Sequence, residues 1–253
     1  MSMLNTAAAV LRCFSPDHPE LTTSEVADLL HLPKSNASRV LRAMREAGFV
    51  DAVPGSRRYR PGLLHLELGQ VLRNGSVQWR EAQAVLLRLS RLGRLSGEVS
   101  LRDGAEVVRL LRMKDGLPLP TAPGCAPGRA PVWNDAAGLA LLARLPEANL
   151  SALLAQVPPE PGAEAVAQAV AAARRESFVR LPGPDERLES LAFAVLDPAR
   201  EEAVAISLLV PDLSYPEGQR LLSAILTEMR SLAALIGDRD LLRGLAPAQP
   251  RAA

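Results

Sequence analysis

The chain has 253 residues, which suffices for one large domain or two modest ones. Hydrophobic residues make up 48% and charged residues 23%, as in a globular protein, and no apolar run approaches the roughly 18 uncharged residues of a membrane helix. The net charge of +1 indicates no partner by itself. Because the first residues lack the pattern of a secretory signal and the two cysteines are far apart, we expect a cytoplasmic protein without a membrane partner.

The basic residues are concentrated in one segment. Residues 34–60 hold seven basic and two acidic side chains, so this stretch has an excess of five positive charges and the rest of the chain is slightly acidic. A compact basic segment of this kind is typical of a module that binds phosphate groups.

Two short helices are predicted before this segment. Residues 4–14 alternate small and apolar side chains, and the sequence Asp-His-Pro at 17–19 ends that helix. Thr22 and Glu25 then have the spacing of a capping box, in which the hydroxyl caps the next helix and the carboxylate reaches back. A tight turn at 31–33 follows.

The third predicted helix, about residues 33–47, has two different faces. Its apolar side chains form one stripe at helical spacing, namely Ala37, Val40, Leu41 and Met44. The opposite side is polar and basic, and Gly48 ends the helix. Arginine, asparagine and serine can hydrogen-bond to base edges in the major groove or to phosphates. The candidate DNA-contacting residues are Lys34, Ser35, Asn36, Ser38, Arg39 and Arg42.

A short β-hairpin is predicted directly after this helix. Two β runs, 49–52 and 57–60, flank a turn that contains Pro54 and Gly55. A hairpin after a helix-turn-helix is a wing, and its arginines can contact phosphates or enter the minor groove. The candidate wing residues are Arg57, Arg58 and Arg60. The first part of the chain is therefore expected to bind double-stranded DNA.

The remainder predicts a mixed domain of helices and strands. Residues 63–93 are mostly helical, and the apolar face with Leu64, Leu68, Val71 and Leu72 is a candidate dimer surface. Strands are expected on both sides of Asp103-Gly104, at 190–197 and at 203–210, and helices at 134–145, 163–176 and 216–236. The expected organisation is a DNA-binding domain at 1–72, a linker helix at 73–93, a second domain at 94–237 and a disordered tail at 238–253.

Two stretches of the first part, LTTSEVADLLHLPKSNASRVLRAMREAGFV and RRYRPGLLHLELGQ, carry a family resemblance. The sequence resembles the IclR family of bacterial transcriptional regulators, and weaker similarity continues through 96–109, 131–146 and 192–211. The resemblance implies an α+β fold: an N-terminal winged helix-turn-helix, a linker helix and a C-terminal GAF-like (PAS-like) effector domain. It also implies DNA binding as dimers or dimers of dimers, and two recognition helices in a dimer fit a palindromic operator.

The same resemblance places a small-molecule effector pocket between the sheet and the loop-helix at 131–139. Its implied lining is Trp133, Ala136, Ala137, Ser190 and Ser207, with Leu209 as an apolar wall. Relatives that bind small carboxylates have a cysteine in place of Ser190 and a polar residue in place of Leu209, and many members have a Gly-Lys pair where this chain has Gly138-Leu139. These departures predict a ligand more apolar than a two- or three-carbon acid, because a buried dianion needs polar partners. Arg180 either pairs with one carboxylate at the pocket mouth or lies on the surface.

Two other interpretations compete with a ligand-responsive regulator. In one, the second domain only oligomerises. In the other, the chain is an enzyme with an appended helix-turn-helix, but residues 96–236 lack a nucleophile with a nearby base, a metal-ligand spacing and a phosphate loop. We therefore expect no enzymatic activity, no cofactor and no metal. Cys125 is a candidate redox sensor, although only Arg129 lies near enough in sequence to lower its pKa.

Overall fold

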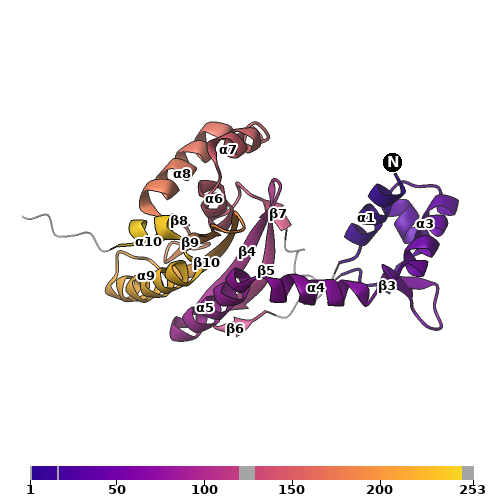
Figure 1. The fold of residues 1–253 in the computed structure, drawn as a ribbon, viewed down its shortest axis with the longest axis horizontal. Helices are drawn as coiled ribbons and strands as arrows, with labels where there is room; N and C mark the ends of the chain where they lie inside the picture. The colour runs from indigo at the N-terminus through magenta and orange to yellow at the C-terminus, as the bar shows by residue number, and fades with distance from the viewer. Residues whose placement is uncertain (1, 16, 120–128, 247–253) are drawn as a thin grey trace, which may run out of the picture. The chain divides into compact units, whose positions relative to one another are not determined.

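The structure, a computed structural model, describes residues 2–15, 17–119 and 129–246, and Cys125 lies outside the described residues. These residues form two compact units, one up to Ser76 and one from Val77 onward (Figure 1). The first unit contains α1 (Met3–Cys13), β1 (Leu21–Thr22), α2 (Thr23–Leu29), α3 (Lys34–Glu46), β2 (Val50–Ala52), β3 (Arg58–Pro61) and α4 (Leu64–Gly75). The second begins with α5 (Val77–Gly93), β4 (Ser96–Asp103), β5 (Glu106–Lys114), β6 (Leu117–Pro118), β7 (Arg129–Pro131) and α6 (Ala136–Ala143). It continues with α7 (Glu147–Leu154), α8 (Ala163–Glu176), β8 (Val179–Pro182), β9 (Leu188–Asp197), β10 (Glu202–Pro211), α9 (Pro216–Ile236) and α10 (Arg239–Gly244).

The first unit is a winged helix-turn-helix, as predicted. Thr22 accepts a hydrogen bond from the Glu25 amide while the Glu25 carboxylate accepts one from the Thr22 amide, so the predicted capping box of α2 is present. The predicted apolar stripe of α3 is buried, in a core that α1 and α2 complete. Gly48 has φ +78°, a left-handed conformation that lets the chain leave α3 for the wing.

The wing is a three-stranded antiparallel sheet in the order β1-β3-β2. The sequence predicted the edge strand β2 and the central strand β3, but not β1. The additional strand β1 is two residues long, and Leu21 and Thr22 pair with Tyr59 and Arg58 of β3. A pairing of two residues has no periodicity of its own, which is why the sequence pattern missed it.

The predicted linker helix at 73–93 differs from the observed structure. The chain is helical on both sides but breaks at Ser76, which has extended φ and ψ, so α4 and α5 are separate helices that belong to different units. None of the residues of α4 is buried, whereas α5 buries Ala82, Val85, Leu86 and Leu89 in the core of the second unit. Residues 77–93 are therefore a core helix rather than a linker.

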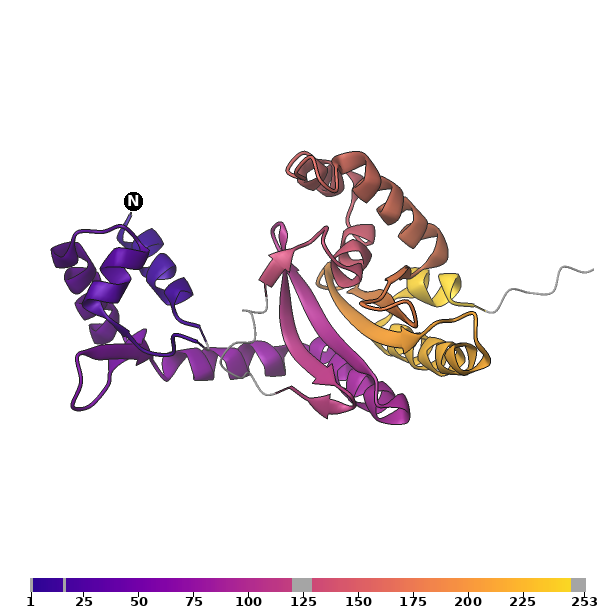
Figure 2. The same ribbon diagram turned by 180° about the vertical axis from the view of Figure 1, so that it is seen from behind.

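The second unit is built on one antiparallel sheet in the order β6-β5-β4-β10-β9-β8, with β7 paired to β5. Helices α5 and α9 cover one face, and α6, α7 and α8 lie on the other (Figures 1 and 2). Successive residues of β9 alternate between the two cores: Leu191, Phe193 and Val195 face α5 and α9, and Ala192 and Ala194 face α6. The small side chains on the α6 side let that almost entirely buried helix approach the sheet closely.

The C-terminal segment is more ordered than the sequence predicted. Disorder was expected from residue 238, but Asp238 caps α10 by accepting a hydrogen bond from the Leu241 amide, and Leu241 is buried against α9 and the sheet. The prediction was wrong for residues 238–246 because two buried leucines, Leu241 and Leu245, and one capping aspartate are enough to hold a short helix. Residues 247–253 lie outside the described residues.

Candidate functional site

The solvent-facing side of α3 carries the predicted DNA-contacting residues. Five of the six side chains are exposed, namely Lys34, Ser35, Ser38, Arg39 and Arg42. Asn36 is half-buried, and its Oδ1 accepts a hydrogen bond from Arg39 Nη2 at 3.1 Å. The opposite stripe of the helix is fixed in the core, so these polar side chains project from a rigid support.

The three wing arginines have different surroundings. Arg57 and Arg60 are exposed, and Arg57 lies in the turn before β3. Arg58 is half-buried and is held by the unit itself: Nη1 donates to the Glu20 carbonyl at 2.9 Å and lies 3.3 Å from Glu25 Oε2. The sequence analysis grouped all three as candidate DNA contacts, and the structure gives Arg58 partners within the protein.

The Arg58 contacts connect the wing to the start of α2. Glu25 accepts hydrogen bonds from the Thr22 amide and from Arg58. The Thr22 amide, its hydroxyl and the positive charge of Arg58 hold the pKa of Glu25 below its ordinary value. The helix-turn-helix and the wing are therefore joined by a charged carboxylate as well as by the common core.

In the second unit, three of the predicted effector-binding residues surround one cavity of about 210 Å³. Ser190, Ser207 and Leu209 lie on neighbouring strands, since Leu209 pairs with Ser190 and Ser207 pairs with Glu98. We call this space the effector cavity, and its lining is Ser96, Gly97, Glu98, Arg112, Met113, Ser190, Ser207, Leu208 and Leu209. The wall thus combines three serine hydroxyl groups, an apolar part and two charged side chains.

The charged side chains belong to an ion-pair cluster that the sequence analysis missed. Arg109 Nε lies 2.8 Å from Glu98 Oε2, and Arg109 Nη2 lies 2.8 Å from Asp135 Oδ2. Arg112 Nε is 3.8 Å from the same Glu98 oxygen, the longest of the three distances. Burial raises the pKa of Glu98 above its ordinary value despite the nearby Arg109. The available signal was the alternation of β4, which turns Glu98 to the face opposite the buried Val99.

Trp133, Ala136 and Ala137 do not line the effector cavity. The two alanines are buried in the core between α6 and the sheet, and Trp133 packs against that core. The loop before α6 fits closely on the helix, because a Cβ at Gly138 would lie 1.9 Å from the Val132 carbonyl oxygen. The loop and the first turn of α6 are therefore in direct contact at Gly138.

Arg180 is also not part of the lining of the effector cavity. Its guanidinium is about half exposed and pairs with Glu189, with Nη2 2.6 Å from Oε1. Among residues 2–15, 17–119 and 129–246, no three histidine, cysteine or acidic side chains come together in a way that could hold a metal ion. Over the same residues, no helix has the length and apolar character needed to cross a membrane.

Comparisons with known proteins agree with this description. Residues 4–54 match the IclR helix-turn-helix domain. The chain is 31% identical over 149 residues to the HTH-type transcriptional regulator XynR of Escherichia coli (strain K12). The aligned residues make up 58% of this chain and 58% of XynR, so the chain spans little more than half the length of that relative. Its fold is similar to an IclR family transcriptional regulator from Brucella abortus, with a TM-score of 0.71, 19% identity and coverage of 94% of this chain and 92% of that one.

A second solved structure extends the similarity of fold. It is an IclR homologue from Microbacterium hydrocarbonoxydans in complex with 4-hydroxybenzoate, with a TM-score of 0.70, 23% identity and coverage of 96% of this chain and 99% of that one. The sequence resemblance thus agrees with a domain match over the first unit and with a shared fold over both units. The chain therefore carries an IclR-type helix-turn-helix domain, and its fold over both units is similar to that of solved IclR family regulators.

Proposed function

We propose that the protein is a cytoplasmic, sequence-specific regulator that binds double-stranded DNA through α3 and the wing. The observation that carries this proposal is the exposed row of polar and basic side chains on α3, backed by a buried apolar stripe and followed by a wing with exposed arginines. A helix with this division presents side chains to the major groove while its other face stays in the core. Selection of duplexes from a random-sequence pool by the full-length protein tests the proposal, and recovery of no preferred sequence contradicts it.

Base reading by α3 is expected to depend on Arg39 and Arg42. Replacing either with alanine should cost about 1–3 kcal/mol on the selected duplex and relax preference at one base position. Gel-shift titration against the selected and a scrambled duplex measures both effects. Arg175→Ala removes the same charge from an exposed position in the second unit and serves as the control. Unchanged specific affinity in both α3 variants would contradict base reading by these residues.

The wing arginines are expected to divide into two classes. Arg57→Ala and Arg60→Ala should weaken binding to all duplexes alike and lower the slope of log affinity against log salt by roughly one, because each removes one phosphate contact. Arg58→Ala should instead lower the unfolding midpoint of the first unit, since Arg58 bonds to Glu20 and Glu25. Salt-dependent titration and chemical denaturation of the same three variants separate the classes. A normal midpoint with a reduced salt slope for Arg58→Ala would assign Arg58 to the DNA as well.

We further propose that the effector cavity binds a small molecule with one anionic group and an apolar body. The hydroxyls of Ser190 and Ser207 are available to hydrogen-bond to the ligand, and Met113, Leu208 and Leu209 supply apolar surface. Glu98 is already neutralised by Arg109, whereas Arg112 is 42% exposed and only loosely paired. Arg112 can therefore pair with one carboxylate of a ligand. A dianion is disfavoured because its second negative charge would lack a partner.

Calorimetry on the full chain tests this ligand class with two probes, 4-hydroxybenzoate and glyoxylate. We expect 4-hydroxybenzoate to bind more tightly, and Arg112→Gln to weaken it roughly tenfold or more, because hydrogen bonds to charged groups contribute about 1.5–3 kcal/mol. Arg91→Gln, an exposed arginine of α5 outside the cavity, is the control. Tighter binding of glyoxylate would contradict the apolar argument. Binding of neither probe would favour a second unit that only oligomerises.

A further inference from the structure

We propose that the second unit contains a second small-molecule site, which takes a neutral, largely apolar ligand with one hydrogen-bond acceptor. The observation is a cavity of about 520 Å³ next to the turn between β9 and β10, here called the hairpin cavity. Its volume falls within the roughly 300–1,000 Å³ of ordinary ligand pockets, and that of the effector cavity does not. The hairpin cavity is lined by Trp79, Leu101, Arg102, Leu141, Arg144, Leu145, Pro146, Asn149, Leu196, Pro198, Glu201, Glu202 and Ala203.

The hairpin cavity is separate from the effector cavity. Both use strands β4, β9 and β10, but at opposite ends. The effector cavity takes residues from the row in which Ser96, Leu209 and Ser190 are paired. The hairpin cavity takes Leu101 from the other end of β4, together with the pair Leu196 and Ala203 where β9 and β10 approach their turn. The two linings have no residue in common.

The wall of the hairpin cavity favours an apolar ligand body. Trp79 of α5 supplies aromatic surface, and leucines from β4, α6, the segment after α6 and β9 line the same cavity. Aromatic and aliphatic walls with a few polar groups are typical of sites for organic molecules, where burial of apolar surface supplies most of the affinity.

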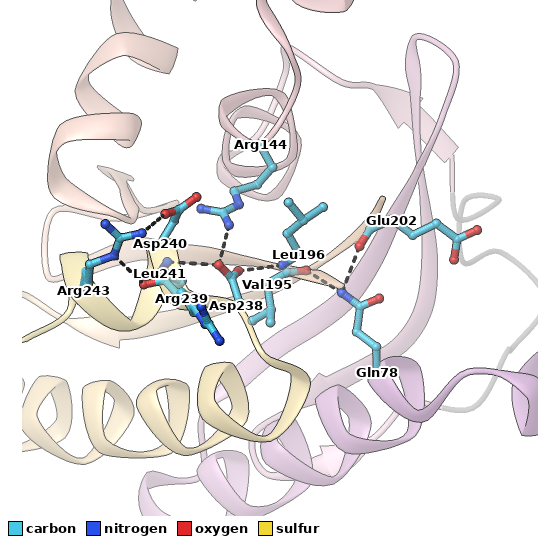
Figure 3. A network of polar contacts seen from close by, with 10 residues as sticks. All are labelled: Gln78, Arg144, Val195, Leu196, Glu202, Asp238, Arg239, Asp240, Leu241 and Arg243. Carbon is cyan, nitrogen blue, oxygen red and sulfur yellow. Dashed lines mark hydrogen bonds and ion pairs between the residues drawn. The ribbon is translucent and has the colours of Figure 1, made fainter. Parts of the chain in front are cut away.

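The charges around Arg144 favour a neutral ligand. Arg144 Nη2 lies 2.6 Å from Asp238 Oδ1, and the Asp238 side chain is only 2% exposed, so the positive charge of Arg144 is already paired (Figure 3). The Arg144 side chain lines the cavity and is 17% exposed after it has paired with Asp238. A guanidinium has five N–H donors, so Arg144 retains donor capacity after it has paired with Asp238. A carbonyl oxygen can use that capacity without bringing a second negative charge next to Asp238.

The polar contacts behind the wall hold the site in shape. Asp238 also accepts a hydrogen bond from the Leu196 amide at 2.8 Å, which fixes the end of β9. Gln78 Nε2 donates to the Val195 carbonyl at 2.5 Å and the Glu202 carbonyl at 3.2 Å, and thereby joins the start of α5 to both strands of the hairpin (Figure 3). A binding site whose side chains are already fixed before the ligand binds loses less affinity to the entropic cost of ordering them than a site that must form on binding.

The two tryptophans of the chain make the proposal directly testable, because Trp79 lines the hairpin cavity and Trp133 lies outside both cavities. The probe is 2-acetylnaphthalene, a neutral aryl ketone, titrated into full-length protein while tryptophan emission is followed. We expect saturable quenching in Trp133→Phe, where Trp79 is the only tryptophan, and no saturable quenching in Trp79→Phe. We expect 2-ethylnaphthalene, which lacks the acceptor, and the anion 2-naphthoate to bind Trp133→Phe roughly 2- to 10-fold more weakly than the ketone.

Two matched substitutions locate the binding. In the Trp133→Phe background, Ala203→Leu places a larger side chain in the hairpin cavity and is expected to weaken the ketone at least tenfold. Ala199→Leu adds the same side chain to the exposed turn outside the cavity and is expected to change nothing. Equal weakening by both variants, no saturable quenching of Trp79, or equal affinity for the ketone and 2-naphthoate would overturn the proposal.

Discussion

Replacing Leu68 and Leu72 together with glutamate is expected to yield a folded monomer that loses at least a hundredfold in affinity for its selected duplex. Leu68 and Leu72 are 48% and 62% exposed on α4, a helix with no buried residue, so their replacement leaves the core of the first unit intact. Val71 continues the same apolar surface. An exposed stripe of this kind fits a second copy of the chain, and two copies are needed to engage both halves of a palindromic site.

Analytical ultracentrifugation and gel-shift titration of the same samples measure both parts of this expectation. The matched control is Gln70→Glu with Asn74→Glu, which adds two negative charges at the same spacing on the opposite, polar side of α4. That control is expected to remain dimeric and to lose only the modest affinity that added charge causes. A monomeric wild type that binds tightly, or a Leu68/Leu72 variant that stays dimeric, would refute the role of this surface.

The second large effect is expected at Asp238. Its carboxylate pairs with Arg144 and accepts hydrogen bonds from the Leu196 and Leu241 amides, while its side chain is almost fully buried. Asp238→Ala should lower the free energy of unfolding of the second unit by about 3–5 kcal/mol, because it leaves a buried guanidinium and two amides without partners. Chemical denaturation of the full chain measures the loss.

Two further variants test whether the large loss of stability at Asp238 comes from the burial of its ion pair. Asp240→Ala removes a carboxylate that pairs with Arg243 at 2.8 Å, where both side chains are about three-quarters exposed, and should cost less than about 1 kcal/mol. Adding Arg144→Met to Asp238→Ala should recover part of the stability, because it removes the uncompensated charge. A loss at Asp238 no larger than that at Asp240 would show that burial adds nothing to this contact.

The sequence predicted the first unit in greater detail than the second for a physical reason. The capping box at Thr22 and Glu25 and the apolar stripe of α3 depend on neighbours three or four residues apart, which a sequence pattern shows directly. Strands β9 and β10 and helix α9 were predicted close to their observed bounds because each strand has a largely apolar run and the helix has a long helical periodicity.

The candidate sites depended more on contacts between distant parts of the chain. Arg58 meets Glu25 across 33 residues, so its partners in the first unit were not visible in the wing sequence. The ion pairs of Glu98 depend on the register of β4 and β5, and Arg109 also pairs with Asp135 at the start of α6. Arg144 and Asp238 are 94 residues apart, and the hairpin cavity beside them has no local motif. The resemblance placed Ser190, Ser207 and Leu209 in one site, and the structure brings them together around the effector cavity.

Helix α6 has a buried or half-buried ion pair at each end. Asp135, its N-cap, is tied through Arg109 to Glu98 in the effector cavity, and Arg144, its C-cap, is tied to Asp238 beside the hairpin cavity. The eight-residue helix between them is packed almost entirely inside the protein and has little freedom to bend. A shift of α6 at one end must therefore be accommodated at the other. By thermodynamic linkage, any change that a ligand in one cavity makes to affinity in the other is reciprocal and of equal magnitude.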